Sequence, residues 1–378
     1  MIYLDNAATT KPAAALQALF CQYAEQDWHN PSAMYLPAVQ SEQKVNAARK
    51  LLKDAIHAPE AIFTSCGTEG SNTVIFNGWS KKGGANRHFI TSAYEHPCVY
   101  ECFRQLEQQG HRVDYVSAGK AGVITPEAVA SLVCEDTALV AVMHVNNETG
   151  AVNDICAIAD AVKAKNPETL VYADGVQAYL RIPFDMAGSK VDYYTASAHK
   201  VHGLKGTGIL FYKKGSPLKA YLVGGGQEGT LRSGTENTFG ILAFAEAAKM
   251  LLQNNTQKTA HMQMLKDTLC TALMQAKGAV CISPANSAPH ILNMAFSGMR
   301  GEVLLHLLEK DGVCIATGSA CSSKKRSFRV HESVGLPPAL AECAVRFSFC
   351  PDNTLEEIQY TAEKTLAALK KFQGFIRR

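Results

Sequence analysis

The sequence lacks the marks of membrane, secreted and zinc-binding proteins. No stretch of its 378 residues approaches 18 consecutive apolar residues, so no membrane-spanning helix is expected. The first residues, MIYLDNAATTKP, have no basic region followed by an apolar run, so no secretory signal is predicted. The 12 cysteines are scattered, without a CxxC pair or a His/Cys group at zinc spacing. We therefore expect reduced thiols in a cytoplasmic protein, and no metal site.

The chain also lacks a strong charge of either sign. It has 37 Lys and Arg residues against 34 Asp and Glu residues, and this net charge of +3 argues against nucleic acid or a membrane as partner. Its 47% hydrophobic and 19% charged residues are ordinary for a globular protein. A chain of 378 residues is long enough to bury a substantial core, in one to three domains.

Short apolar runs alternate with amphipathic segments up to about residue 235. The apolar runs predict strands at residues 61–64, 88–91, 113–116, 138–144, 170–173, 192–196 and 208–212. Helices are predicted between them at residues 97–109, 126–133 and 155–165. This alternation indicates an α/β fold with βαβ units and a mostly parallel sheet, whose carboxyl edge is where ligands bind.

The rest of the chain has a different pattern. Long helices are predicted at residues 238–252 and 256–276, then short strands at 279–282, 291–296, 313–316 and 344–349, with helices at 302–310 and 355–372. This order indicates a second, smaller α+β domain. We predict a large domain of residues 12–250 and a small domain made of residues 1–11 and 251–378.

Polar residues follow three of the predicted strands. Gly67 and Thr68 open a helix whose unpaired N–H groups suit a phosphate, although an ordinary helix cap is a common role for such residues. His96 lies at a strand end, where it is placed for ring stacking or proton transfer, or serves as a structural histidine. Asn147 is placed to hold a substrate carboxylate or a cofactor oxygen, or to build a turn.

Two further strand ends carry groups suited to a pyridine ring. Asp174 follows an apolar strand, where a carboxylate is costly unless it has a cationic partner such as a protonated pyridine nitrogen; helix capping is the alternative. Gln177 is placed to bond a neighbouring ring oxygen. Ser197, His199 and Lys200 follow the next strand, and burial lowers the pKa of a lysine, as imine formation requires.

Together these residues predict a pocket for pyridoxal phosphate. Lys200 supplies the amine, and Asp174 keeps the ring protonated so that it accepts electrons from a substrate carbanion. His96 covers the ring, and the anion site binds the phosphate. The alternative for Lys200, a surface lysine in a loop, is disfavoured by this combination.

Six motifs resemble those of the NifS/IscS cysteine desulfurases, within the class V aminotransferase fold. They are IYLDNAATT, NNETG, SAHKVHGLKGTG, GGGQEGTLRSGTEN, GSACSS and VRFS, in the family order and over nearly the whole chain. The resemblance implies a pyridoxal phosphate enzyme of fold type I, with a large domain around a mostly parallel sheet and a smaller C-terminal domain. The GSAC form resembles the group I branch.

The resemblance implies a role for each cofactor residue. Lys200 binds the cofactor and shuttles the Cα proton, while His96 stacks on the ring and assists proton transfer. Asp174 pairs with the pyridine nitrogen, and Gln177 bonds the ring hydroxyl. Thr235 reaches the phosphate of the other subunit's cofactor, so a homodimer is implied. The phosphate of the subunit's own cofactor is bound by Gly67, Thr68, Ser197 and His199.

The resemblance also implies the substrate residues. Asn147 and Arg346 hold the carboxylate of L-cysteine, and Arg346 suits this independently because guanidinium binds carboxylate through two parallel hydrogen bonds. Cys321 attacks the substrate sulfur and becomes a persulfide, leaving L-alanine. The sulfur then passes to an acceptor protein, either an iron–sulfur scaffold or a tRNA-thiolation enzyme. The cations at 324–326 either favour the thiolate of Cys321, form a solvated charged run or receive the acceptor.

The sequence departs from the usual family pattern at Leu36, Gly229, His290 and Cys350. None of these positions carries a cofactor or nucleophile residue. Two alternative functions are a selenocysteine lyase or transaminase-like enzyme of the same fold, and a catalytically inactive protein that binds a scaffold. A transaminase needs no loop cysteine, and an inactive protein needs no intact set of Lys200, Asp174 and Arg346.

Overall fold

The computed structural model describes residues 1–79, 87–318 and 328–376. Its largest element is a seven-stranded sheet in the order β2-β8-β7-β6-β5-β3-β4. Strands β3 to β7 run parallel, while β8 pairs antiparallel with both β7 and β2. These strands are β2 (Glu60–Thr64), β3 (His88–Ser92), β4 (Arg112–Val116), β5 (Thr137–Ala141), β6 (Leu170–Asp174), β7 (Tyr193–Ser197) and β8 (Gly208–Tyr212).

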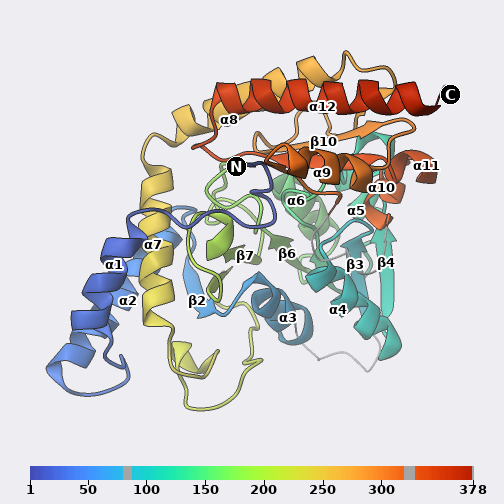
Figure 1. The fold of residues 1–378 in the computed structure, drawn as a ribbon. Helices are drawn as coiled ribbons and strands as arrows, with labels where there is room; N and C mark the ends of the chain where they lie inside the picture. The colour runs from blue at the N-terminus through green and yellow to red at the C-terminus, as the bar shows by residue number, and fades with distance from the viewer. Residues whose placement is uncertain (80–86, 319–327, 377–378) are drawn as a thin grey trace.

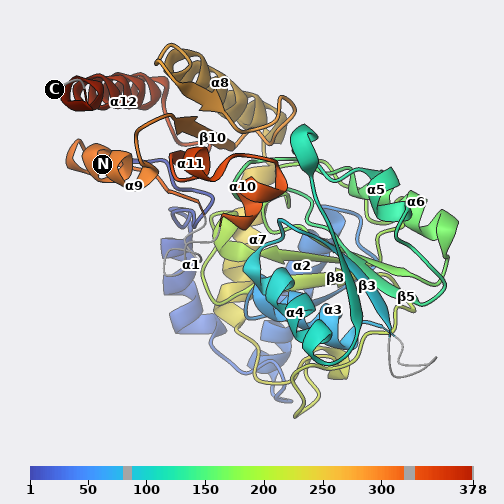
Figure 2. The same ribbon diagram turned by 90° about the vertical axis from the view of Figure 1, so that its right-hand side faces the viewer.

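Helices cover both faces of this sheet, because its strands carry apolar side chains on both sides (Figures 1 and 2). In β3, Phe89 faces the core under α3 and α4, while the next residue, Ile90, faces the opposite core. The first face is covered by α3 (Gly67–Asn77) and α4 (Pro97–Gln108). The second is covered by α2 (Leu36–Asp54), α5 (Pro126–Ala130), α6 (Ile155–Lys165) and α7 (Thr238–Leu252).

A second, smaller group of elements has a core of its own. The antiparallel sheet β12-β10-β9 lies beneath the neighbouring helices α8 and α12 (Figure 1). Figure 2 shows this group to one side of the large sheet. Its elements are α8 (Asn255–Leu273), β9 (Ala279–Cys281), β10 (Ile291–Phe296), α9 (Gly301–Lys310), β11 (Val313–Cys314), α10 (Arg329–Ser333), α11 (Pro338–Ala341), β12 (Ala344–Ser348) and α12 (Leu355–Ile376).

The first ten residues join the two groups. Strand β1 (Ile2–Tyr3) pairs parallel with β11, and Leu4 belongs to the core of the smaller group. Further along, Thr10 donates its backbone N–H to the carbonyl of His199, beyond the end of β7. These contacts support the predicted division into residues 12–250 against 1–11 with 251–378, which we keep as a proposal. The remaining short elements are α1 (Leu16–Gln22), η1 (Tyr23–Asp27), η2 (Gly119–Ala121), η3 (Ala198–Lys200) and η4 (Glu228–Thr230).

The mostly parallel α/β architecture predicted from the sequence is confirmed. Four predicted elements are too long by two or three residues: the strands expected at 138–144 and 313–316 end at Ala141 and Cys314, and the helices expected at 126–133 and 256–276 end at Ala130 and Leu273. Beyond Ala141 the chain stays buried but no longer pairs as a regular strand, so its apolar run does not mark the end of the ladder. Helix α2 was missed, because its apolar positions are spaced by alanines and polar residues.

Gly175 provides a test of this packing. It follows β6, and a Cβ built there lies 2.0 Å from Cζ of Tyr194, a fully buried ring on β7. We expect Gly175→Ala to lower the free energy of unfolding by about 1–3 kcal/mol, because the ring must move within a packed core. The matched control is Gly188→Ala, whose Cβ meets only the exposed carboxylate of Asp185. Equal unfolding midpoints for the two variants in urea would contradict this account.

Candidate active site

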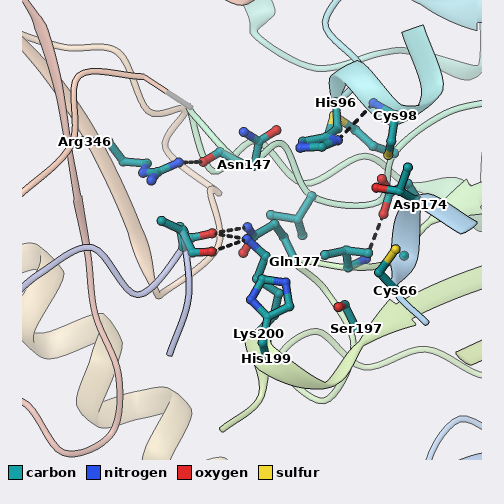
Figure 3. A pocket seen from close by; sticks show the side chains of 17 residues that line it. Cys66, His96, Cys98, Asn147, Asp174, Gln177, Ser197, His199, Lys200 and Arg346 are labelled. Carbon is teal, nitrogen blue, oxygen red and sulfur yellow. Dashed lines mark hydrogen bonds between the residues drawn. The ribbon is translucent and has the colours of Figure 1, made fainter. Parts of the chain in front are cut away.

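A cavity of about 210 Å³ lies at the carboxyl edge of the large sheet. Parallel strands end at this edge, so the residues that follow β2, β6 and β7 meet there. Figure 3 shows the side chains that line the cavity. Ten of the residues predicted from the sequence are among them: Gly67, Thr68, His96, Asn147, Asp174, Gln177, Ser197, His199, Lys200 and Arg346.

Asp174 is the last residue of β6, and its carboxyl group is buried. Burial raises its pKa to about 6, against a backbone hydrogen bond from the N–H of Val176 to Oδ1 at 2.9 Å and the nearby charge of Lys200. The carboxylate is therefore mostly ionised at pH 7. A buried carboxylate of this kind favours a cationic group beside it in the cavity.

Lys200 ends the short helix η3, which follows β7 directly. Its Nζ donates hydrogen bonds to the backbone carbonyls of Ala7 and Ala8, at 2.6 and 2.8 Å. The side-chain amide of Gln177 donates to the same carbonyl of Ala7 at 2.8 Å. Figure 3 shows both side chains turned toward this segment. The carbonyls of the N-terminal segment thus hold the Lys200 amine in the cavity.

His96 precedes α4 and lines the cavity. Its Nδ1 accepts a hydrogen bond from the backbone N–H of Cys98 at 3.2 Å, so the neutral ring carries its proton on Nε2. Burial lowers the pKa of His96 to about 4, and the positive charges of Lys200 and Arg329 act in the same direction. The ring is therefore an uncharged flat surface at pH 7, suited to stack on another ring and to donate from Nε2.

Groups suited to an anion gather at the start of α3. The helix begins at Gly67, and a Cβ built there lies 2.7 Å from Cγ2 of Val176, so only glycine lets the backbone approach so closely. The hydroxyl of Ser197 is buried and has no hydrogen-bond partner within the described chain. Thr68 and His199 complete the set on the same cavity wall. A helix N-terminus beside an unpaired hydroxyl is suited to phosphate.

Arg346 lies on β12 and reaches the cavity from the smaller group of elements. It is fully buried, and its two terminal nitrogens donate to the carbonyl of Asn147 at 2.7 Å and to the carboxylate of Asp5 at 2.6 Å. The bond to Asn147 is drawn in Figure 3. Arg346 and Asn147 therefore lie side by side, as their predicted use on one substrate carboxylate requires.

One predicted site residue, Thr235, lies elsewhere, and another, Cys321, is not among the described residues. Thr235 is exposed and lines a separate hollow of about 80 Å³ with Ser65 and Arg232, away from the cavity of its own chain. Cys321 lies outside the described residues, as do Lys324, Lys325 and Arg326.

Sequence reasoning missed three kinds of residue that line the cavity or hold its side chains. Asp5 and the carbonyls of Ala7 and Ala8 belong to a motif that the sequence analysis quoted without giving its residues a role. Cys66 and Cys98 line the cavity beside Gly67 and His96. Their positions next to predicted site residues were the available signal. Met143 and Val145 also line it, where the predicted strand 138–144 ends.

Comparison with known proteins assigns the family. The model of the aminotransferase class-V family matches residues 2–361. The chain belongs to the class-V aminotransferase family. A NifS/IcsS protein homologue of Lactobacillus delbrueckii subsp. bulgaricus is 39% identical, over 99% of this chain and 98% of the relative. Cysteine desulfurase 2 of Trichormus variabilis is 36% identical, over 95% of this chain and 90% of the relative.

A solved structure agrees with the sequence relatives. The chain of a NifS-like protein superposes with a TM-score of 0.92 at 34% identity, covering 98% of this chain and 99% of that one. The predicted NifS/IscS-like resemblance and the fold of type I pyridoxal phosphate enzymes are thus confirmed. Within the class-V aminotransferases, this chain groups with the cysteine desulfurases.

Class-V aminotransferases depend on pyridoxal phosphate, and the residues of this cavity fit that group. The buried hydroxyl of Ser197 has no partner among the described residues, as expected of a group that bonds a ligand. The closely packed Gly67 leaves backbone N–H groups open toward the same wall. At the other side, Asp174 offers a buried negative charge to a ring cation, and Lys200 offers an amine. The donor set therefore matches both ends of the cofactor.

The four departures from the family pattern leave this pocket intact. Leu36 is exposed at the start of α2, and Gly229 has a positive φ of 63° in η4. His290 and Cys350 are buried near the join between the two groups of elements. Burial lowers the pKa of His290 well below its usual range, and both its ring nitrogens are without partners in the described part of the chain. None of the four lines the cavity.

Asp174 predicts a specific pH dependence of cofactor binding. Asp174 is expected to pair with the ring nitrogen, and protonation below about pH 6 removes its charge, so affinity for pyridoxal phosphate should fall there, by up to about tenfold per pH unit. His96 and His199 titrate near pH 4 and lie outside this range. The measurement is an absorbance titration with pyridoxal phosphate between pH 5 and pH 8.

Asp174→Asn should bind pyridoxal phosphate more weakly than the parent at pH 8. It should also lose the fall in affinity below about pH 6, so that only the pH dependence of the Lys200 amine remains. The control is Asp154→Asn, which removes a carboxylate that caps α6 through the N–H of Ala157. A pH profile for Asp174→Asn that matches the parent would show that Asp174 does not pair with the cofactor.

Proposed function

We propose that this chain is a cysteine desulfurase that removes sulfur from L-cysteine and releases L-alanine. The observation that carries the proposal is the convergence of Lys200, Asp174, His96 and Arg346 on one cavity. The first three serve a pyridoxal phosphate ring, and Arg346 adds a buried cation for an amino-acid carboxylate. The alternative functions are not favoured, because the relatives described above include cysteine desulfurases and the site residues are intact.

The substrate is oriented by its carboxylate. Arg346 is fully buried, and its guanidinium presents parallel N–H donors that match the two oxygens of a carboxylate. In the described structure Asp5 occupies one of these donors and the carbonyl of Asn147 the other. An incoming carboxylate therefore competes with Asp5 for Arg346, while the side chain of Asn147, which lines the cavity, supplies a further donor.

Proton transfer is assigned to Lys200 and His96. The cofactor, when bound through Lys200, supplies an electron sink for the Cα carbanion of the substrate. Lys200 would take the Cα proton of the substrate and return it. His96 donates from Nε2, because its Nδ1 accepts the N–H of Cys98. Asp174 would hold its negative charge beside the bound cofactor, because it is mostly ionised at neutral pH.

Sulfur transfer is assigned to Cys321. Its thiolate attacks the substrate sulfur, the Cβ–S bond breaks, and Cys321 retains the sulfur as a persulfide. The residue is flanked by serines and an alanine in the sequence, and the cations at 324–326 favour the thiolate. The final acceptor is proposed to be an iron–sulfur scaffold or a tRNA-thiolation enzyme.

No helix in the described part of the chain is long and apolar enough to cross a membrane.

We also keep the proposals of a cytoplasmic location and of a homodimer. The first is supported by the eleven described cysteines, all free thiols. The second is supported by Thr235, which is exposed and does not line the cavity of its own chain. Light scattering of the purified protein should give the mass of two chains. A monomer with full activity would contradict the predicted contact of Thr235 with a partner's cofactor.

The proposed roles of Cys321 and Lys200 are tested by two substitutions. With L-cysteine and a reductant, the parent should release alanine and sulfide in equal amounts. Cys321→Ala should keep the visible absorbance of the bound cofactor but lose sulfide release by about 100-fold or more, because the nucleophile is gone. Lys200→Ala should lose both the absorbance and the turnover.

The matched controls are Cys21→Ala and Lys214→Ala, which remove the same groups from exposed positions outside the cavity. Both should behave as the parent. Sulfide release by Cys321→Ala near the parent rate would exclude the persulfide route. Turnover of another amino acid by that variant would favour a transaminase.

A further inference from the structure

A second group of reactive side chains lies at the other edge of the large sheet. His88, Arg112 and Thr137 are the first residues of β3, β4 and β5, and the ladder places His88 opposite both Arg112 and Thr137. Cys134 precedes β5 in the connection from α5. Because these strands are parallel, their amino ends meet at the edge opposite the cofactor cavity. None of these residues lines that cavity.

The sulfur of Cys134 has three polar neighbours. Nη2 of Arg112 donates a hydrogen bond to Sγ at 3.1 Å. The hydroxyl of Thr137 lies 3.5 Å from Sγ, and Nδ1 of His88 lies 3.5 Å from it. Cys134 also donates its backbone N–H to the Thr137 hydroxyl at 2.8 Å, which fixes the start of the turn. The thiol is half-buried, so it remains open to small molecules.

His88 is oriented toward the sulfur by Asp114. Its Nε2 lies 2.9 Å from Oδ2 of Asp114, a carboxylate that accepts and cannot donate when ionised, so Nε2 carries the ring proton. Nδ1 is then an acceptor, which the Thr137 hydroxyl faces at 2.8 Å and the sulfur of Cys134 at 3.5 Å; the single Thr137 proton goes either to Nδ1 or to the sulfur. The order carboxylate, imidazole, thiol is the arrangement that activates sulfur nucleophiles. The imidazole is buried, whereas Asp114 and Cys134 are partly exposed.

Charges around the sulfur favour its thiolate. Burial alone raises the pKa of Cys134, but hydrogen bonds from Thr137, the backbone N–H of Asp136 and Arg112, together with the charge of Arg112, lower it overall. The pKa of His88 is lowered by burial and by Arg112, against Asp114 and Asp136. The neutral ring and the cation therefore face the sulfur together. Among the described residues, the charged or titratable groups that act on Cys134 and His88 are Arg112, Asp114 and Asp136, and Glu135 follows Cys134 in the connection to β5.

The other described cysteines lack this environment. Burial raises the pKa of five of them, and none of these has a guanidinium donor to its sulfur among the described hydrogen bonds: Cys98, Cys102, Cys156, Cys281 and Cys350. Cys156, on α6, is half-buried like Cys134 and is the natural internal comparison. Metal binding is not indicated at Cys134, since the described residues contain no group of three or more side chains arranged to hold a metal ion.

We propose that Cys134, with Arg112, His88 and Asp114, is a second thiol site whose sulfur attacks the S–S bond of small disulfides or persulfides. The proton of the thiol passes to Nδ1 of His88 or to water. The thiolate then attacks one sulfur of the incoming molecule, the new S–S bond forms on Cys134, and the old one breaks. The leaving sulfur departs as a thiolate and takes up a proton. Cys134 is oxidised and the leaving group is reduced, so electrons balance.

Arg112 also indicates which small molecules this site accepts. Its guanidinium is exposed, and it has further N–H donors besides the one that faces Cys134. These donors suit a carboxylate on the incoming molecule. The substrate class is therefore a carboxylate-bearing disulfide or persulfide. This inference does not rest on the proposed desulfurase activity, because the site lies at the opposite edge of the sheet and uses none of the cavity residues.

The test is the rate at which each cysteine of the holoenzyme reacts with iodoacetamide, followed by mass spectrometry of the peptides between pH 5 and pH 10. At pH 7, Cys134 should react about tenfold or more faster than Cys156, and the increase of its rate with pH should begin at a lower pH than that of Cys156. This comparison needs no substitution. Equal rates for Cys134 and Cys156 at every pH would overturn the proposal.

Substitution of Arg112 tests whether the reactivity of Cys134 comes from the nearby cation or only from the exposure of the thiol. Arg112→Gln should slow the reaction of Cys134 at pH 7 several-fold and shift its pH profile upward, while Cys156 is unaffected. The control Arg104→Gln removes a guanidinium from a neighbouring exposed ion pair with Glu107 that does not contact Cys134. Sulfide release from L-cysteine should be unchanged in Cys134→Ser. A Cys134 profile in Arg112→Gln that matches the parent would contradict the role of the cation.

The two sulfur sources are distinguished by their adducts. Glutathione disulfide should leave glutathione on Cys134, and glutathione persulfide should leave one additional sulfur atom. Either adduct on Cys134, formed faster than on Cys156, supports the site and names its source. Absence of both adducts under conditions in which an exposed thiol such as Cys21 reacts would overturn it.

Discussion

The buried carboxylate of Asp174 is the constraint on which the rest of the site depends. It ends the central strand β6, in a position where water reaches almost none of it, and its pKa of about 6 leaves it charged at neutral pH. A charge in such a place is tolerated only beside other polar groups or a cation. The lysine on the neighbouring strand end and the cationic ring of pyridoxal phosphate meet this requirement together. The family assignment and the physical reading of the pocket therefore agree.

The N-terminal segment is the part of the chain that completes this arrangement. Carbonyls of Ala7 and Ala8 hold the amine of Lys200, and Asp5 pairs with Arg346 from the other group of elements. Ser348 on β12 donates its hydroxyl to the carbonyl of Leu4 and its backbone N–H to the same residue. One short segment thus contacts Lys200, Arg346 and both cores. Under the proposed function, its bonds to Lys200 and Arg346 are the ones that cofactor and substrate would replace.

The fold and the cofactor residues could be predicted from the sequence, because both follow from local patterns in the chain. Apolar runs at regular spacing predict strands, and polar residues after parallel strands must meet at one edge, which brings Gly67, Asp174 and Lys200 together without any knowledge of the ladder. Asp5 could not be placed by this rule, because its strand-like segment pairs with β11 from the far end of the chain. The same limit applies to Cys134, which the composition indicates only as one reduced thiol among 12. Its neighbours His88 and Arg112 come from two other strands, and only the register of the sheet places them side by side.

The most direct measurement of the central claim identifies the amine that carries the cofactor. The holoenzyme is treated with borohydride, which fixes pyridoxal phosphate on the lysine that holds it, and the labelled peptide is sequenced by mass spectrometry. The account predicts one label per chain, on Lys200, the residue that lies in the cavity with Asp174. A label on any other lysine, with Lys200 unmodified, would contradict the assignment of this cavity as the active site.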